Sequence, residues 1–383
     1  MSRMRSTCFQ ALLLLCCIAC HRPQPLNVMY PAPGVDITDE GNHLRLDEKG
    51  KHFTYDDLFA GARFIWLKSM DQDSIGLIND IQVYQHNYYL LDYGQQKLLS
   101  FDPEGNPRFT LSASDTAGAT LKKIMGFSIN TKTRTLEVFD GVAKKVLKYS
   151  FDGKPAGELA FPYNYREVAC NAQGEYIVYA PGLQNELNGK RSGAAVFSVK
   201  EDGTFGREMM DLQTDFPIEY FPSNCLSGFG DSITLVSNYA TAAFRFHGDK
   251  ITRAFDIDHG EYWFRSLHTT GASGSSLVLD YSKEGKEGPV SAQCLVLEDG
   301  KRLYTDSVIN NFFPLAVGIP VHFSSSSAMT GLLPAKAFAR IGDPAGGWTA
   351  RSPQYNDILA RVTDLQQRIT DNSDAVIIEL PLK

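Results

Sequence analysis

Reactive side-chain types are densest between His259 and His268, where the sequence reads HGEYWFRSLH. In an extended strand, His259, Glu261, Trp263 and Arg265 project to one side because alternate residues share a face, whereas His268 falls on the other. A tryptophan beside an arginine and two ionisable groups can stack a sugar or another ring and bind a carboxylate. The four residues are therefore a candidate binding lip. The alternative is a polar loop whose aromatic residues pack into the core.

Known catalytic motifs are absent from the sequence. It contains no HExxH zinc motif, no GxxxxGK[ST] phosphate-binding loop, no GxSxG nucleophile elbow and no EF-hand calcium loop. The leading expectation is therefore a non-catalytic protein, and no cofactor is predicted with it.

The overall charge argues against nucleic acids as partners. The formal net charge is −7 over 383 residues, and the pI is about 5.7. Such a protein does not attract a phosphate backbone, and no long run of lysine and arginine creates a local attraction. The 23 phenylalanines and 17 tyrosines instead favour a β-rich globular fold.

The N-terminus has the pattern of an export signal. Arg3 and Arg5 precede an apolar run at residues 11–19 that is too short to span a bilayer. The run ends in CIAC at residues 17–20, which resembles a bacterial lipobox with cysteine where leucine is usual. Residues 1–19 are predicted as a signal peptide and Cys20 as the lipidated mature N-terminus. The alternative is an ordinary secretory signal cleaved before Cys20.

Residues 20–55 are polar, lack a clear period and contain Pro23, Pro25, Pro31 and Pro33. This composition predicts a lipidated N-terminal tether whose first part is extended, ahead of a propeller domain at residues 56–383.

The remaining cysteines do not have the spacing of a metal site. Cys170, Cys225 and Cys294 are 55 and 69 residues apart, which matches no CxxC-type zinc motif. An odd number of thiols leaves at least one unpaired or paired between chains, and we expect buried free cysteines.

A turn that follows a strand-like run recurs along most of the chain. Its six occurrences, 44 to 51 residues apart, are Phe101-Asp102, Phe151-Asp152-Gly153-Lys154, Glu201-Asp202-Gly203, His247-Gly248-Asp249-Lys250, Glu298-Asp299-Gly300-Lys301 and Ile341-Gly342-Asp343. The spacing is that of a propeller blade, because four short strands and their turns use about 40–50 residues. A β-sandwich has no reason to repeat one turn at nearly constant spacing.

Residues 88–111, YYLLDYGQQKLLSFDPEGNPRFTL, show one repeat unit clearly. Two apolar runs and a third strand surround the turn at Asp102, and these residue types are typical of consecutive antiparallel strands. The sequence therefore predicts an all-β fold, a six-bladed β-propeller of four-stranded antiparallel blades.

The end of the chain departs from the repeat. Ser352-Pro353 predicts the start of one short helix, on which the apolar residues share a face: Ile358, Leu359, Val362, Leu365 and Ile369. The following run, AVIIEL at residues 375–380, is strongly β-forming. We expect it to share a blade with the N-terminal strand near Phe64 to Leu67, which would tie the ends of the ring together.

Strand-like pieces at the two ends of the repeat region, and one between them, carry a family resemblance. They are Leu67, Asp73-Ser74-Ile75-Gly76, Ile78-Asn79-Asp80-Ile81, Tyr89-Leu90-Leu91-Asp92, Leu98-Leu99-Ser100-Phe101-Asp102, Gly105, Ala254 to Gly260 (AFDIDHG) and Asp371 to Lys383 (DNSDAVIIELPLK). Together they resemble the six-bladed β-propeller lipoproteins of Bacteroidetes. The resemblance covers about residues 58–383. It implies the propeller fold and a lipid anchor, and it offers no catalytic residues to transfer.

A calcium site is a second possibility for the propeller channel. Propeller lactonases hold calcium there with oxygen ligands, which in this chain would come from Asn171, Glu175, Asn224, Asn238 and Asp280. The alternative is that these residues form the turns at blade corners, where Asn and Asp are common.

Three functions remain open from the sequence. The first is a lipid-anchored binding module of the cell envelope, with a glycan, a peptide or an envelope protein as ligand and the membrane as partner through the lipid. The others are a calcium-dependent hydrolase or lactonase and a structural envelope component. Residues 21–25, HRPQP, lack the acidic cluster that often directs such lipoproteins to the cell surface. We therefore expect an outer-membrane lipoprotein on the periplasmic face.

Overall fold

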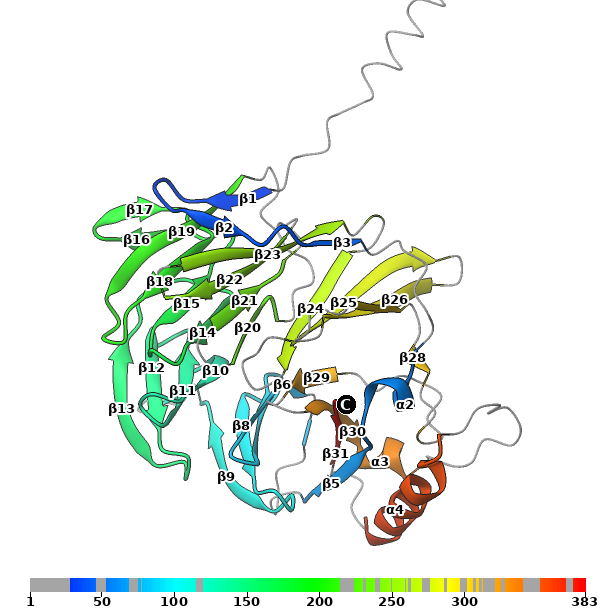
Figure 1. Cartoon of the computed structure of the whole chain (residues 1–383). Coiled ribbons are helices and arrows are strands. Elements are labelled where there is room, and N and C mark those ends of the chain that lie inside the picture. Colours follow the sequence, from blue (N-terminus) through cyan, green and yellow to red (C-terminus); the bar gives the residue numbers. More distant parts are fainter. Residues whose placement is uncertain are drawn as a thin grey trace, which may run out of the picture.

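The structure is a computed structural model (Figure 1). It describes residues 28–45, 53–68, 75–76, 78–114, 120–213, 224–229, 232–237, 242–248, 250–258, 260, 263–270, 276–285, 288–296, 302–305, 308–309, 312, 321–324, 328–339, 352–369 and 375–383. The predicted signal peptide and Cys20 lie outside these residues.

Six sheets, each with four antiparallel blade strands, are arranged as blades in the described part of the chain (Figure 1). Blade 1 contains β6 (Ile78–Tyr84), β7 (Asn87–Asp92), β8 (Lys97–Phe101) and β9 (Pro107–Ser112). Blade 2 contains β10 (Ile124–Asn130), β11 (Thr135–Asp140), β12 (Lys145–Tyr149) and β13 (Pro155–Ala160). Blade 3 contains β14 (Glu167–Cys170), β15 (Tyr176–Tyr179), β18 (Val196–Val199) and β19 (Phe205–Gln213), with the hairpin β16 (Asn185–Leu187) and β17 (Lys190–Ser192) inserted.

The other three blades complete the circle. Blade 4 contains β20 (Leu226–Phe229), β21 (Ser232–Leu235), β22 (Ala242–His247) and β23 (Lys250–Asp258). Blade 5 contains β24 (Trp263–Thr270), β25 (Ser276–Gly285), β26 (Gly288–Val296) and β27 (Arg302–Thr305). Blade 6 contains β29 (Val321–Ser324), β30 (Ala328–Pro334), β31 (Ala375–Pro381) and β5 (Arg63–Leu67).

The first strands of the blades form a closed inner ring. The contacts run in order from β6 to β10, β14, β20, β24 and β29, and β29 contacts β6 again. The predicted six-bladed β-propeller is therefore confirmed.

Blade 6 closes the ring with strands from both ends of the chain. Its third strand, β31, pairs antiparallel with its outer strand, β5, so that Ile377 lies opposite Ile65 and Ala375 opposite Leu67. The same residues belong to an apolar cluster that also contains Leu90 of blade 1. The closure that the sequence predicted is confirmed, and it seals the contact between blades 6 and 1.

The apolar core lies between neighbouring blades, and this explains the strand sequences. In β7, five of six residues are buried, and β15 is buried throughout. A strand in the middle of a blade is covered on both faces by the adjacent blades, so it reads as a continuous apolar run without alternation. The runs LL and YIVY in the sequence follow from this double burial.

The recurring turn joins the third and fourth strands of a blade. In blade 1, Asp102 Oδ1 accepts the backbone N–H groups of Glu104 at 3.0 Å and Asn106 at 2.8 Å. The Asn106 side chain donates to Asp102 Oδ2 at 2.9 Å. Burial on its own raises the pKa of Asp102, but the hydrogen bonds from Asn106 and Glu104 outweigh it and hold that pKa below its usual value.

The same turn also docks on the outer strand of the preceding blade. Its glycine has a left-handed φ of 79° at Gly105, 77° at Gly153 and 81° at Gly203. A Cβ at these glycines would meet the preceding blade within 2.0–2.6 Å: Gly105 meets the Trp66 carbonyl oxygen of β5, Gly153 the Phe109 ring of β9, and Gly203 the Ala160 carbonyl oxygen of β13. The glycine of the repeated turn is therefore needed both for the left-handed backbone of the turn and for its close contact with the preceding blade.

The sixth occurrence of the turn is not equivalent to the other five. Ile341-Gly342-Asp343 lies outside the described residues, in the segment between β30 and β31, which are the second and third strands of blade 6. Blade 6 has no connection between its third and fourth strands, because these strands come from opposite ends of the chain. The blade count is correct, but one of the six turns used to reach it belongs to a different connection.

Part of the segment predicted as a tether pairs with the propeller. We call residues 28–45 the strap. It contains β1 (Val28–Pro31), antiparallel to β19, followed by β2 (Ile37–Asp39) and β3 (His43–Arg45), both parallel to β23. Further on, β4 (Phe53–Thr54) pairs with β28 (Val308–Ile309). Without these strands the outer edges of β19 and β23 would be unpaired, and the polar sequence did not indicate this pairing.

Three helices lie in the described part of the chain: α2 (Tyr55–Leu58), α3 (Ala335–Phe338) and α4 (Tyr355–Arg368). The predicted helix is α4, but its N-cap is Gln354, so the prediction that it starts at Ser352-Pro353 is wrong by two residues. It packs against blade 6 through Tyr355, Ile358, Val362 and Leu365. None of the helices among the described residues has both the length and the apolar character needed to cross a bilayer.

Replacing the docked turn glycine of blade 1 should destabilise the ring. Gly105→Ala is expected to lower the free energy of unfolding by about 3 kcal/mol, since the left-handed φ costs about 1–2 kcal/mol and the clash with Trp66 adds to it. Gly248→Ala is the matched control, because Gly248 has a φ of 52° but no atom within 4 Å of the added Cβ. The control should lose about 1 kcal/mol in urea unfolding. Equal losses would contradict the docking role.

Candidate functional site

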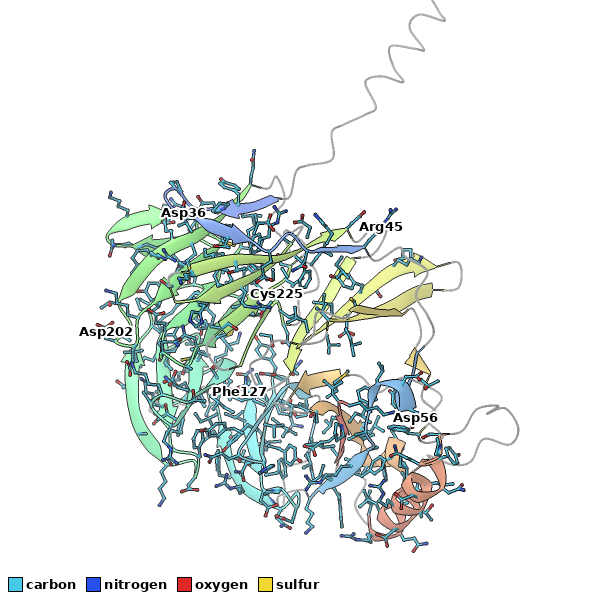
Figure 2. The ribbon with its side chains drawn as sticks, in the orientation of Figure 1. Asp36, Arg45, Asp56, Phe127, Asp202 and Cys225 are labelled. Atoms are coloured by element: carbon cyan, nitrogen blue, oxygen red, sulfur yellow. The ribbon has the colours of Figure 1, made fainter. Side chains whose placement is uncertain are left out.

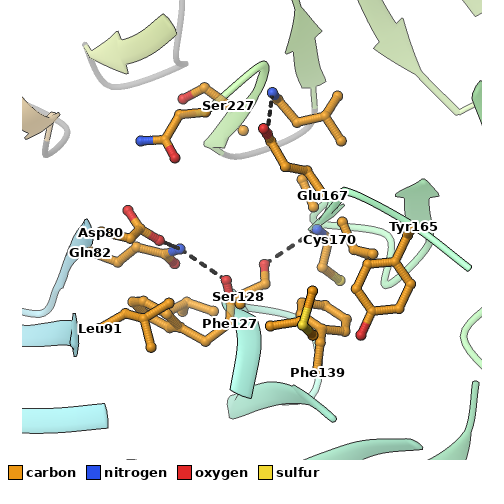
Figure 3. Close-up of a pocket in the computed structure, with 18 of the residues that line it drawn as sticks. Asp80, Gln82, Leu91, Phe127, Ser128, Phe139, Tyr165, Glu167, Cys170 and Ser227 are labelled. Atoms are coloured by element: carbon orange, nitrogen blue, oxygen red, sulfur yellow. Dashed lines mark hydrogen bonds between the residues drawn. The ribbon is translucent and has the colours of Figure 1, made fainter. Parts of the chain in front are cut away.

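A cavity lies in the propeller channel beside the inner strands of blades 1 to 4 and Leu267 of blade 5 (Figure 3). Its volume is about 570 Å³, within the range of small-molecule sites. Consecutive residues line it at 125–129 and 165–172. Because neighbouring residues of a strand point to opposite faces, such unbroken runs mean that the edges of β10 and β14 border the cavity. Backbone groups as well as side chains are therefore available there.

Aromatic and apolar side chains form one part of the wall. Tyr165 precedes β14 and packs its ring against Phe139 and Phe161, with centroids 6.3 and 5.7 Å away. Burial and then the charge of Asp140 raise the pKa of Tyr165 well above its usual value, so the phenol stays protonated. Tyr93, 37% exposed, places its hydroxyl 3.7 Å from the sulfur of Met125.

Polar side chains from blades 1 and 2 lie on another part of the wall (Figure 3). The Gln82 amide donates to Asp80 Oδ2 and to the Phe127 carbonyl oxygen, both at 3.1 Å. The Ser128 hydroxyl accepts the backbone N–H of Cys170 at 3.3 Å. These bonds join blade 1 to blade 2 and blade 2 to blade 3, so they hold the inner ring together.

Glu167 makes the corresponding link between blades 3 and 4. Its Oε1 accepts the backbone N–H of Cys225 at 2.9 Å, and its Oε2 accepts that of Leu226 at 2.8 Å. Both carboxylate oxygens therefore have backbone donors at the start of β20. A carboxylate held in this way is poorly suited to exchange protons with a substrate, because a proton on either oxygen would face an N–H donor. Its role is structural.

Arg166 adds a positive charge to the rim of the cavity. Its side chain is exposed and lines the cavity next to Tyr165 and Glu167. A guanidinium can hydrogen-bond to a carboxylate or stack on a ring, and both modes suit ligand binding. The cavity thus offers an apolar ring surface, a cation and several hydrogen-bonding groups.

The candidate binding lip remains a prediction. His259 and Glu261 lie outside the described residues, while Trp263 and Arg265 belong to β24, the inner strand of blade 5. Trp263 pairs with Ser282, and the register shifts between Phe264 and Ser266. The backbone therefore places Trp263 and Arg265 in the inner strand of blade 5, a different blade from the cavity residues described above. The shift also interrupts the simple alternation on which the prediction relied.

The candidate calcium ligands have different places in the fold. Asn171 and Asn224 line the cavity, Asp280 lies in β25, and Asn238 is outside the described residues. Asn171 Oδ1 accepts the backbone N–H groups of Gln173 at 3.0 Å and Glu175 at 2.9 Å. This is the turn-forming role that the sequence offered as the alternative. No group of three or more His, Cys, Asp or Glu residues is arranged to hold a metal within the described ranges.

The three later cysteines are free and buried, as expected. Cys170 borders the cavity, and burial followed by the nearby charge of Glu137 raises the pKa of its thiol well above the usual value. A protonated, buried thiol is a poor nucleophile. Cys170 therefore contributes packing to the cavity wall.

The sequence did not point to Asp80, Gln82, Tyr165, Arg166 or Glu167 as cavity residues. They come from two segments separated by more than 80 residues, and each is an ordinary residue for a short strand or its approach. Knowing which strand of each blade is innermost would have drawn attention to them. That assignment needs the strand order of the blades.

Residues 36–306 match a family described as 6-bladed beta-propeller. Among solved structures, a "Putative exported protein" from Bacteroides fragilis aligns with a TM-score of 0.67 and 11% identity, covering 91% of this chain and 100% of that one. This likeness shows a shared fold.

Two further matches are weaker. A protein from Bacteroides vulgatus has a TM-score of 0.40 and 8% identity, over 94% of this chain and 99% of that one. A virginiamycin B lyase from Staphylococcus aureus has a TM-score of 0.39 and 11% identity, over 83% and 99%. Neither carries a functional argument. No curated protein matches the chain.

The structural role of Glu167 can be measured. Glu167→Gln should lower the free energy of unfolding by about 2 kcal/mol, because one acceptor oxygen becomes an NH₂ group facing a backbone N–H. Glu158→Gln is a suitable control, since Glu158 is a half-exposed carboxylate paired with Lys145 and should contribute under about 0.5 kcal/mol. Urea unfolding of both variants tests this. A fully stable Glu167→Gln protein would show that the carboxylate is not a link between blades.

Proposed function

The chain belongs to this family of 6-bladed β-propellers, and on that basis we propose that it is a lipid-anchored, non-catalytic binding module of the cell envelope. Its ligand would occupy the channel cavity at blades 1 to 4. A shared fold does not define an activity, so the proposal depends on the chemistry of the cavity.

The main support for the proposal is the hydrogen bonding of the carboxylates that line the cavity. The two carboxylates that line it are Asp80, which receives a hydrogen bond from Gln82, and Glu167, which receives two from the backbone of blade 4. Acid–base catalysis needs a group that can take up and release a proton beside the substrate. Both oxygens of Glu167 instead link blade 3 to blade 4, and this favours binding over chemistry.

The cavity favours a ligand with both an apolar face and several hydrogen-bonding groups. Tyr93 and Tyr165 supply ring surfaces, and Arg166 supplies a cation at the rim. The edges of β10 and β14 add backbone donors and acceptors. Short saccharides and short peptides both have this combination, and either would be held without covalent chemistry.

The cell-envelope location is supported by the N-terminal sequence. Cys20 ends a lipobox-like segment after an export signal, and two acyl chains would give stable attachment to a membrane. The export named for the Bacteroides fragilis protein with the same fold agrees with this location. Our proposal is an outer-membrane lipoprotein on the periplasmic face, akin to the propeller lipoproteins of Bacteroidetes.

A cavity-filling variant tests the binding site. Gly126 lines the cavity, and a Cβ added there would meet only the Phe139 ring, at 4.0 Å. Gly126→Leu should therefore fold. Its affinity for a ligand identified on a glycan or peptide array should be at least tenfold lower than that of the wild type in calorimetric titration. Ala156→Leu adds a similar side chain to the exposed outer strand of the same blade and should bind normally.

Two outcomes would contradict the binding proposal. Unchanged affinity in Gly126→Leu would place the ligand outside the channel cavity. Arrays without a ligand, together with a pull-down from envelope extracts without a partner, would argue against a binding module altogether.

The lipid anchor has a separate test. Cells grown with an alkyne-tagged fatty acid should label the wild-type protein and not Cys20→Ser, because only the thiol at position 20 is expected to carry lipid. Cys294→Ser removes a buried thiol and should remain labelled. Protease treatment of intact cells should leave the protein uncut on the periplasmic face. Labelling of Cys20→Ser, or digestion in intact cells, would overturn the corresponding part of the proposal.

A further inference from the structure

The strap fixes the point at which the chain leaves the ring. Its first described residue, Val28, pairs with Gln213 at the outer edge of blade 3. Figure 2 shows Asp36 and Arg45 of the strap at one edge of the molecule and Asp56 at another. The site where the chain joins the propeller therefore lies on the perimeter of blades 3 and 4.

Packing and hydrogen bonds hold the strap in place. Met29, Ala32 and Leu44 are at most 5% exposed, and Met29 and Leu44 belong to the apolar cluster of blades 3 to 5. Burial of a Met or Leu side chain is worth about 1.5–3 kcal/mol. The Asn42 side chain also donates to the Ala254 carbonyl oxygen at 3.0 Å. Releasing the strap would therefore cost several kcal/mol.

The length of chain between the lipid site and the strap is short. Cys20 and Val28 are eight residues apart, which corresponds to at most about 26–29 Å of extended chain. A tether that ran to Tyr55 would span 35 residues and reach about 120 Å. The diameter of a domain of this size is about 50 Å, so half its circumference is about 80 Å. The long tether would allow every orientation at a membrane, whereas the short one does not.

We propose that the perimeter of blades 3 and 4, covered by the strap, is the surface that faces the lipid bilayer. This orientation rests on the proposed lipidation of Cys20. The connection from Cys20 to Val28, which we call the leash, is too short to pass around the ring, so blades 6 and 1 cannot be the side that faces the membrane.

The exposed side chain next to the leash suits a lipid surface. Tyr30 on β1 is 42% exposed and is one of three large hydrophobic side chains that are exposed among the described residues. Tyrosine is favoured at membrane interfaces, where its ring contacts the acyl boundary and its hydroxyl remains in water. The residue thus places an interfacial group within two positions of the start of the strap.

This orientation has a consequence for the channel. The perimeter of a propeller lies at right angles to its central axis, so with blades 3 and 4 towards the bilayer the channel runs along the membrane plane. Both mouths then open sideways into the aqueous compartment. A water-soluble ligand can reach the cavity without crossing the membrane surface, and the membrane covers neither mouth.

Fluorescence energy transfer from a dye on the protein to labelled lipid measures the orientation of the ring at the membrane. Single cysteines are introduced at Asp36 in the strap and at Gln367 in α4 on blade 6, both exposed in the structure. The lipidated full chain, purified from cells, carries a donor dye at one site and is reconstituted into vesicles of phosphatidylethanolamine and phosphatidylglycerol with acceptor-labelled lipid. Transfer at position 36 should exceed that at position 367 at least threefold.

A longer leash provides the matched control. Insertion of 20 Gly/Ser residues between Pro25 and Leu26 should reduce the difference between the two positions to less than 1.5-fold, while the fold is unchanged. Equal transfer at both positions in the natural-length protein, or stronger transfer at position 367, would overturn the orientation although the anchor holds. Failure of the protein to float with the vesicles would instead show that the anchor is absent, and the orientation would fall with it.

Discussion

The antiparallel pairing of β31 with β5 is the interaction on which the rest of the structure depends. It joins residues 375–379 to residues 63–67 and turns a linear series of blades into a ring. Bringing the two ends of the chain together costs conformational entropy. That cost is offset because the same step forms the strand pair and buries the apolar cluster between blades 6 and 1. Closure also protects the edge of β31, which would otherwise be open to another chain.

The properties of the cavity follow from this closed inner ring. Each blade contributes the edge of its first strand, so the channel wall consists of backbone edges and of side chains that link one blade to the next. Gln82, Ser128 and Glu167 make such links between successive blades. The hydrogen-bonding side chains of these three residues are therefore parts of the scaffold. The remaining surface of rings, a guanidinium and strand edges is suited to holding a ligand.

The strap adds strands to the outer edges of two blades. Strands β1 to β3 cover the outer edges of blades 3 and 4, where the long strands β19 and β23 would otherwise be unpaired. If Cys20 is lipidated, as we propose, the same contacts leave eight residue positions between the lipid and the first residue of the strap. One segment would then protect the sheet edges and limit the orientations of the ring at a membrane.

The sequence by itself determined the class of fold, the number of blades, the C-terminal helix and the closing strand, because these depend on local strand patterns, a repeating turn and strong β-propensity. It also indicated buried free cysteines. Only the tertiary structure decided that the turn at Gly105 docks on the preceding blade, that the segment predicted as a tether contains four added strands, and that Asp80, Tyr165 and Glu167 share one cavity. These features are contacts between distant segments of ordinary composition. Such contacts leave no local pattern, because they arise only when the ring brings the strand edges together.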